Sequence, residues 1–74
     1  MIKGENNMMT LESKETIEIG MEVRFADLWD GNGYGEEILQ SGTISPDNDN
    51  VVAFDVIEEN SNILNTIVKV TDIY

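Results

Sequence analysis

The 74-residue chain has no cysteine and no histidine, and each absence excludes a group of functions. Without cysteine there is no disulfide, no thiolate metal site and no Cys nucleophile. Without histidine the chain lacks the commonest general base and the commonest transition-metal ligand. Its serines therefore have no imidazole to activate them. We predict a protein that is not an enzyme and uses no cofactor.

Basic residues are also scarce. Four Lys and Arg residues stand against fifteen Asp and Glu residues, and the net charge of -11 exceeds the magnitude of about 2 to 8 that suits a small soluble domain. Residues 17–74 carry twelve of the acidic residues and two of the basic ones, a net charge of -10. Such a surface repels nucleic acid and anionic membrane and attracts basic protein surfaces. The expected partner is therefore a basic protein surface, nucleic-acid-binding proteins included, with no direct binding of nucleic acid or membrane.

Long apolar runs are missing as well. None approaches the roughly 20 residues of a membrane span, and MIKGENNMMT lacks the apolar segment of a signal peptide. A cytoplasmic protein is expected. Residues 1–16 show neither clean alternation nor a helical stripe, so we predict a flexible tail there and one small domain over residues 17–74.

The densest apolar run, Val51–Ile57, is typical of a strand because it is short and rich in β-branched side chains. Its alternation places Val52, Phe54 and Val56 on one face. Asp55 lies on the other face and, since an unpaired carboxylate is costly to bury, that face should point outward. The preceding SPDNDN segment is a turn signal that predicts a hairpin with the strand before it.

Three further strands are predicted on weaker patterns. Residues Ile17–Phe25 alternate over nine positions, and Gly20 predicts a bend or bulge in the middle. Residues Glu37–Ser45 indicate a second strand, and Ile63–Val70 a fourth. A short helical turn is expected at Thr71–Ile73.

The order of these elements resembles the SH3-like barrel. The matching pieces are IEIGMEVRF as the first strand, residues 27–36 as a long loop, SGTIS and VVAFDV as the central hairpin, and IVKVTDIY as the closing segment. The resemblance implies an all-β fold, a small SH3-like barrel of four to five antiparallel strands. Barrels of this shape that bind nucleic acid need a basic face, and here only Arg24 and Lys69 are available.

The acidic composition is similar to that of phage-encoded nucleic-acid mimics, which block restriction, CRISPR or transcription proteins. This likeness implies a non-catalytic inhibitor whose carboxylates replace phosphates on a DNA- or RNA-binding protein. The residues expected to meet the partner are acidic or aromatic and lie in predicted loops or at strand ends: Asp27, Trp29, Asp30, Tyr34, Glu36, Glu37, Asp47, Asp49, Glu58 and Glu59.

A second hypothesis is a structural or adaptor barrel that binds a partner or self-associates as a homo-oligomer. It would use Trp29, Tyr34 and an exposed strand edge. The same two rings would otherwise pack as a lid over the open end of the barrel. A calcium loop starting at Asp30 fails, because Glu37 takes an apolar position and Ser41 replaces the bidentate Glu, so no metal is expected.

Overall fold

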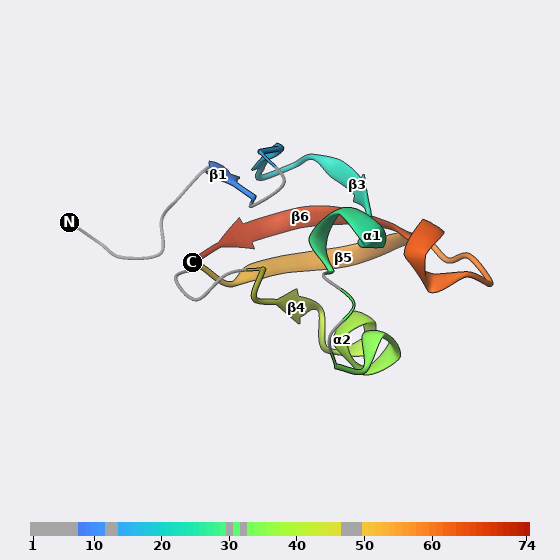
Figure 1. Ribbon diagram of the computed structural model, residues 1–74. Helices are drawn as coiled ribbons and strands as arrows, with labels where there is room; N and C mark the ends of the chain where they lie inside the picture. Colours follow the sequence, from blue (N-terminus) through green and yellow to red (C-terminus); the bar gives the residue numbers. More distant parts are fainter. Residues whose placement is uncertain (1–7, 12–13, 30, 32, 47–49) are drawn as a thin grey trace.

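The computed structural model describes residues 8–11, 14–29, 31, 33–46 and 50–74 of the chain. It is a small all-β domain of antiparallel strands with a few short helices (Figure 1). In chain order the elements are β1 (Met8–Thr10), β2 (Thr16–Glu18), β3 (Glu22–Arg24), α1 (Phe25–Leu28), α2 (Gly35–Ser41), β4 (Thr43–Ile44), β5 (Val52–Glu58), the 3-10 helix η1 (Ile63–Asn65) and β6 (Ile67–Ile73).

The strands form two separate sheets and not the closed barrel expected from the sequence. One sheet is the β1–β2 ribbon, and the other has the order β3-β6-β5-β4, with all neighbours antiparallel. The outer strands β3 and β4 contain only three and two residues. Closing a barrel requires the edge strands to meet over a shared register, and strands this short do not provide one. The SH3-like barrel is therefore wrong in its closure, while the all-β class is confirmed.

The strand predicted over Val51–Ile57 is confirmed as β5, one of the two inner strands of the larger sheet. Val52 and Phe54 are buried and Asp55 is exposed, which confirms the assignment of the inner and outer faces. The hairpin is also confirmed, because β4 pairs antiparallel with β5 through Thr43 opposite Ala53. Val56 departs from the prediction and is 39% exposed.

The predicted strand Ile17–Phe25 is two strands. A turn at Ile19 and Gly20 separates β2 from β3, and Gly20 has a φ of 94°, which residues with a side chain rarely adopt. The bend predicted at this glycine is confirmed. Because of it, β2 pairs with β1 while β3 pairs with β6, so the two halves join different sheets.

The flexible tail predicted for residues 1–16 is wrong for residues 8–11. Met9 and Leu11 are buried, and β1 pairs with β2 through Met9 opposite Ile17. A strand of three residues has too little alternation to be detected in a sequence, and its stability comes from this pairing and burial. Residues 1–7 lie outside the described part of the chain.

The strand predicted over Glu37–Ser45 is mostly a helix. Helix α2 ends at Ser41, and Gly42 follows in the left-handed conformation, with its N–H donating to the Ile38 carbonyl at 3.2 Å. Glu36 and Glu37 lie in the first turn, where the helix dipole favours carboxylates. Only Thr43 and Ile44 form a strand. Together with α1, this helix shortens the long loop predicted for residues 27–36.

The last strand begins and ends later in the chain than the predicted strand Ile63–Val70. Helix η1 comes first, and β6 runs three residues beyond the predicted end, so the helical turn expected at Thr71–Ile73 is wrong. The shift comes from β5, which pairs with β6 as far as Val52 opposite Ile73 and holds the end of the chain in the sheet. Bulges at Ile57 and Thr71 keep buried residues on one face along this pair.

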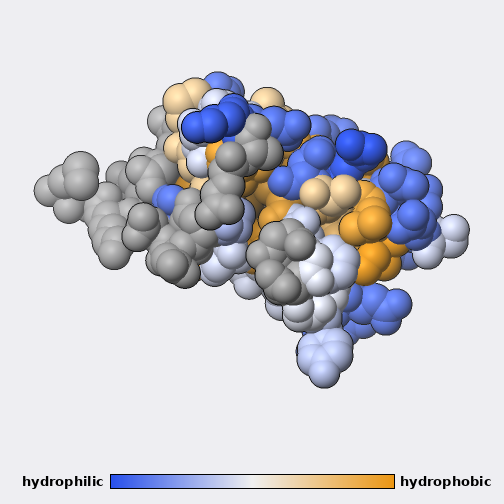
Figure 2. Space-filling model, in the orientation of Figure 1, coloured by the Kyte–Doolittle hydropathy of each residue, from blue (hydrophilic) through white to orange (hydrophobic). Residues whose placement is uncertain are grey.

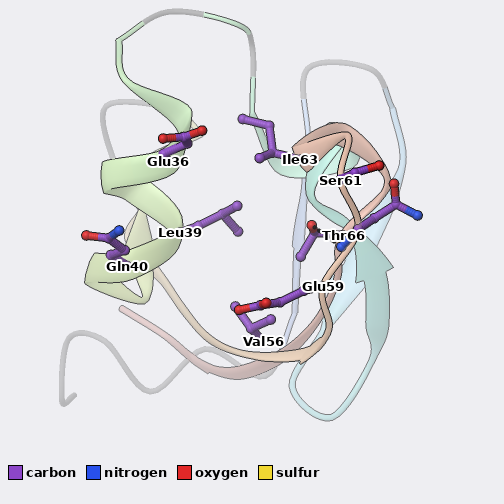
Figure 3. Close-up of a pocket in the computed structure, with 9 residues that line it drawn as sticks. Glu36, Leu39, Gln40, Val56, Glu59, Ser61, Ile63 and Thr66 are labelled. Atoms are coloured by element: carbon purple, nitrogen blue, oxygen red, sulfur yellow. Dashed lines mark hydrogen bonds between the residues drawn. The ribbon is translucent and has the colours of Figure 1, made fainter.

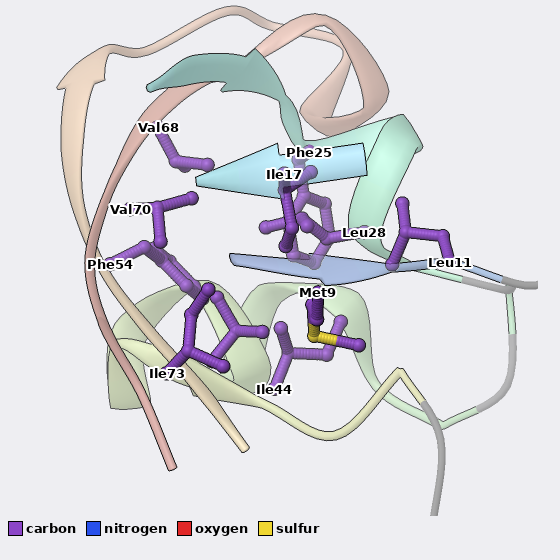
Figure 4. Packing of buried hydrophobic residues seen from close by; sticks show 11 residues of the cluster. Met9, Leu11, Ile17, Phe25, Leu28, Ile44, Phe54, Val68, Val70 and Ile73 are labelled. Atoms are coloured by element: carbon purple, nitrogen blue, oxygen red, sulfur yellow. The ribbon is translucent and has the colours of Figure 1, made fainter. Parts of the chain in front are cut away.

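The core lies between the larger sheet on one side and the β1–β2 ribbon with α1 on the other (Figure 4). Phe25, the first residue of α1, is fully buried at its centre, with its ring centroid 5.4 Å from Trp29 and 6.3 Å from Phe54. The buried set is Met9, Leu11, Ile17, Phe25, Leu28, Ile44, Val52, Phe54, Val68, Val70 and Ile73. This core leaves one end of β5 uncovered, and the candidate site lies there.

Candidate functional site

A groove of about 460 Å³ opens between α2 and the segment that joins β5 to β6 (Figure 3). Its volume lies in the range typical of small-molecule and side-chain pockets, about 300 to 1,000 Å³. We call it the α2–η1 groove. Its lining residues are Glu36, Leu39, Gln40, Val56, Glu59, Asn60, Ser61, Ile63 and Thr66.

One wall of the groove is a single face of α2. Glu36, Leu39 and Gln40 are spaced by three and four residues, so their side chains leave the helix on the same side. Leu39 is partly buried, while Glu36 and Gln40 are exposed above it. The wall is therefore apolar towards its base and polar towards solvent.

The opposite wall is the turn after β5, held in shape by its own amides. The Asn60 N–H donates to Thr66 Oγ1 at 3.2 Å, and the Asn62 N–H donates to Asn60 Oδ1 at 2.9 Å. The Asn62 side chain in turn accepts from the Leu64 N–H at 3.1 Å and caps η1. These bonds fix the backbone from which Glu59 and Ser61 project.

Gly35 sets the distance between the two walls at one end of the groove. It is buried, and a Cβ placed on it would lie 2.6 Å from Ile63 Cδ1 and 2.9 Å from Trp29 Cη2. Only a residue without a side chain allows the start of α2 to approach η1 this closely. The groove therefore begins where this contact ends.

The charged residues that line the groove are both acidic. Glu36 and Glu59 stand on its two walls, both exposed, and no described lining residue is basic. Figure 2 shows hydrophobic surface emerging between hydrophilic residues in the region of α2 and η1. Within the described ranges no group of three or more acidic side chains is placed to hold a metal ion. The arrangement suits a ligand that is apolar along its length and cationic at its end.

The structure brings together two of the residues predicted to meet a partner, Glu36 and Glu59. Two neighbours, Glu37 and Glu58, are exposed at the same end of the molecule but do not line the groove. The predicted residues Asp30, Asp47 and Asp49 lie outside the described residues.

The remaining three predicted residues do not line the groove. Asp27 is half-buried; its carboxylate accepts from the Arg24 N–H at 3.2 Å and lies 3.7 Å from the Arg24 guanidinium. Trp29 is half-buried and packs on Phe25. Tyr34 is 77% exposed and precedes the first residue of α2. Of the two aromatic rings, Trp29 belongs to the packing of the domain and Tyr34 is open to solvent.

Seven lining residues were not predicted from the sequence, and two of them, Leu39 and Gln40, lie on α2. The segment GEEILQSG carries two signals of a helix, acidic residues in the first turn and a glycine after the last, and these would have placed Leu39 and Gln40 beside Glu36. The polar run after β5 predicts only a turn. Its position against α2 has no local signal.

No family model, curated protein or solved structure matches the chain. None of the helices in the described residues is long and apolar enough to cross a membrane.

Proposed function

We propose that the protein is a non-catalytic acidic interaction module that docks on a basic protein surface. The observation that carries this proposal is the exposure of its carboxylates. Of the ten acidic residues in the described ranges, only Asp27 is partly buried, and the other nine are exposed. Between described residues one ion pair lies within 4 Å, that of Arg24 and Asp27. The negative charge is therefore left for a partner to neutralise.

The register of the larger sheet supports the same proposal. Lys69 lies opposite Glu22 on one side and Asp55 on the other, so one of the few basic residues is surrounded by acidic ones on the outer face. Arg24, the other basic residue in the described strands of this sheet, lies 3.7 Å from the Asp27 carboxylate, so each of the two has acidic neighbours. A negative electrostatic field on a folded domain raises the rate of association with a positively charged partner. This effect falls as salt is added.

The partner class we favour is a protein whose basic surface normally holds nucleic acid. The carboxylates would occupy that surface, and the chain would act as an inhibitor. The experiment is affinity capture on the immobilised chain in about 50 mM salt, followed by titration of the purified partner up to about 500 mM, because the Debye length is about 10 Å at 0.1 M. We expect a basic partner, a Kd that rises more than about tenfold over this range, and competition by double-stranded DNA. A Kd that is unchanged by salt would remove the proposal.

A second candidate function is an adaptor that self-associates, and the exposed Tyr34 is the observation that favours it. Trp29→Ala does not test this candidate cleanly, since Trp29 packs on Phe25. Tyr34→Ser is the better variant because the ring is in solvent. We expect concentration-dependent dimers in sedimentation velocity that Tyr34→Ser removes; a monomer at all concentrations contradicts this candidate.

A further inference from the structure

The base of the α2–η1 groove is apolar although it faces solvent. Leu39, Val56 and Ile63 come from α2, β5 and η1, and Val56 remains 39% exposed. Each side chain is left partly uncovered by the domain's own packing. Lysine and arginine bury their aliphatic stems along surfaces of this kind and keep the charged head in water.

The rim of the groove supplies the matching charge. Glu36 stands on the α2 wall and Glu59 on the opposite wall (Figure 3). A cation entering between them meets carboxylates from two directions, and the planar guanidinium of arginine is suited to bonding several oxygens at once. The amide and hydroxyl oxygens of Gln40 and Ser61 add neutral acceptors beside them.

The approach to the groove is open along β5. Strand β4 pairs only with Val52 and Ala53, so residues 55–58 of β5 have no described strand on that side. A segment of a partner can therefore lie along this end of the sheet with a side chain in the groove. A second copy of this chain is a poor occupant, because each copy carries a net charge of -11.

From these observations we propose that the α2–η1 groove is the anchor site for one arginine or lysine side chain of the basic partner. The stem lies over Leu39, Val56 and Ile63, and the cationic head lies between Glu36 and Glu59. This inference rests on the proposed function and adds to it a single defined contact. In a docked complex such an anchor gives orientation, which the diffuse charge of the remaining surface does not give.

The direct test uses two short peptides and the full chain. The first is acetyl-Ser-Val-Arg-Val-Ser-amide, and the second replaces arginine by citrulline, which has nearly the same shape and no charge. We expect the arginine peptide, titrated to millimolar concentration in an amide ¹H–¹⁵N NMR experiment, to shift the resonances of Leu39, Glu59 and Ile63 selectively. The citrulline peptide should shift them at least about fivefold less at equal concentration.

The protein side of the test compares two double variants that remove the same charge. Glu36→Gln with Glu59→Gln neutralises the rim of the groove, whereas Glu15→Gln with Glu18→Gln neutralises exposed residues that do not line it. We expect the groove variant to weaken binding of the arginine peptide about five- to twentyfold and the control variant by less than about twofold. Amide spectra of both free variants report whether the fold is intact.

The results separate this inference from the proposed function. Equal shifts from the citrulline peptide, no selective shift, or equal weakening by the two double variants would overturn the anchor site. Salt-dependent binding of the captured basic partner would in those cases leave the proposed function standing. If instead the partner's affinity ignores salt while the arginine peptide still occupies the groove selectively, the proposed function fails and the cation site remains.

Discussion

The two halves of β5 have the same kind of sequence and opposite surroundings. In the first half Val52 is fully buried, and in the second half Val56 is 39% and Ile57 51% exposed. The first half has β4 on one side, β6 on the other and Phe25 of α1 packed nearby, on Phe54. Among the described strands the second half has β6 alone as a neighbour, and α2 lies across the groove from it. Apolar residues in one continuous strand are thus divided between stabilising the core and lining a site.

The largest expected effect comes from making the same substitution in each half of β5. Val52→Ala removes two methyl groups from a closely packed core and should lower the free energy of unfolding by about 2–3 kcal/mol. Val56→Ala removes the same groups from a partly exposed side chain, and the loss should stay below about 1 kcal/mol. Urea unfolding followed by tryptophan fluorescence measures both. Equal losses would show that the groove end is as tightly packed as the core.

A second variant acts on the contact between Gly35 and η1, which sets the distance between the two walls of the groove. In Gly35→Ala the new methyl group meets Ile63 Cδ1 and the ring of Trp29, so the Ile63 side chain and either the ring or α2 must shift. We expect a loss of about 1–2 kcal/mol, since overpacking exceeds the gain in helix propensity from replacing glycine by alanine.

The matched control for this variant is Glu37→Ala, an exposed position in the same helix, which should change the stability by less than about 0.5 kcal/mol. Thermal unfolding by circular dichroism compares the two variants. A Gly35→Ala protein more stable than the parent would mean that the helix-to-η1 contact is easily relaxed.

The smallest expected effect concerns charge at the groove end. Glu59 follows Glu58 and lies across the groove from Glu36, so Glu59→Gln relieves repulsion between like charges. We expect the Tm to rise by up to about 3 °C in about 50 mM salt and by less than about 1 °C in about 500 mM salt, where screening already removes the repulsion. A fall in Tm at low salt would contradict this account of the groove end.

The parts of the fold that were predicted correctly are those with a local signal. The alternation and Asp55 identified β5 and its outer face, and Gly20 marked the bend between β2 and β3. The parts that were wrong are short or ambiguous. A three-residue strand such as β1 has no period to detect. The short run around Ile38 and Leu39 suits a strand or a helix by its period, and only the flanking signals, Glu36 and Glu37 before it and Gly42 after it, indicate the helix.

The candidate site was predicted only through its charges. Glu36 and Glu59 were predicted because they are acidic residues in predicted loops or at strand ends, whereas Leu39, Val56 and Ile63 carry no signal of a shared surface. They are separated along the chain, and only the packing of α2 against η1 at Gly35 brings them around one space.

By itself, the amino-acid sequence determined the net charge of the protein and the chemistry that it lacks. The net charge of -11 and the lack of cysteine and histidine hold in any fold, since they are sums over residues. Tertiary structure alone decided that the strands stay as two open sheets, and that one end of β5 borders a groove. Those outcomes depend on contacts between distant segments, whose free energies are set by packing and not by local pattern.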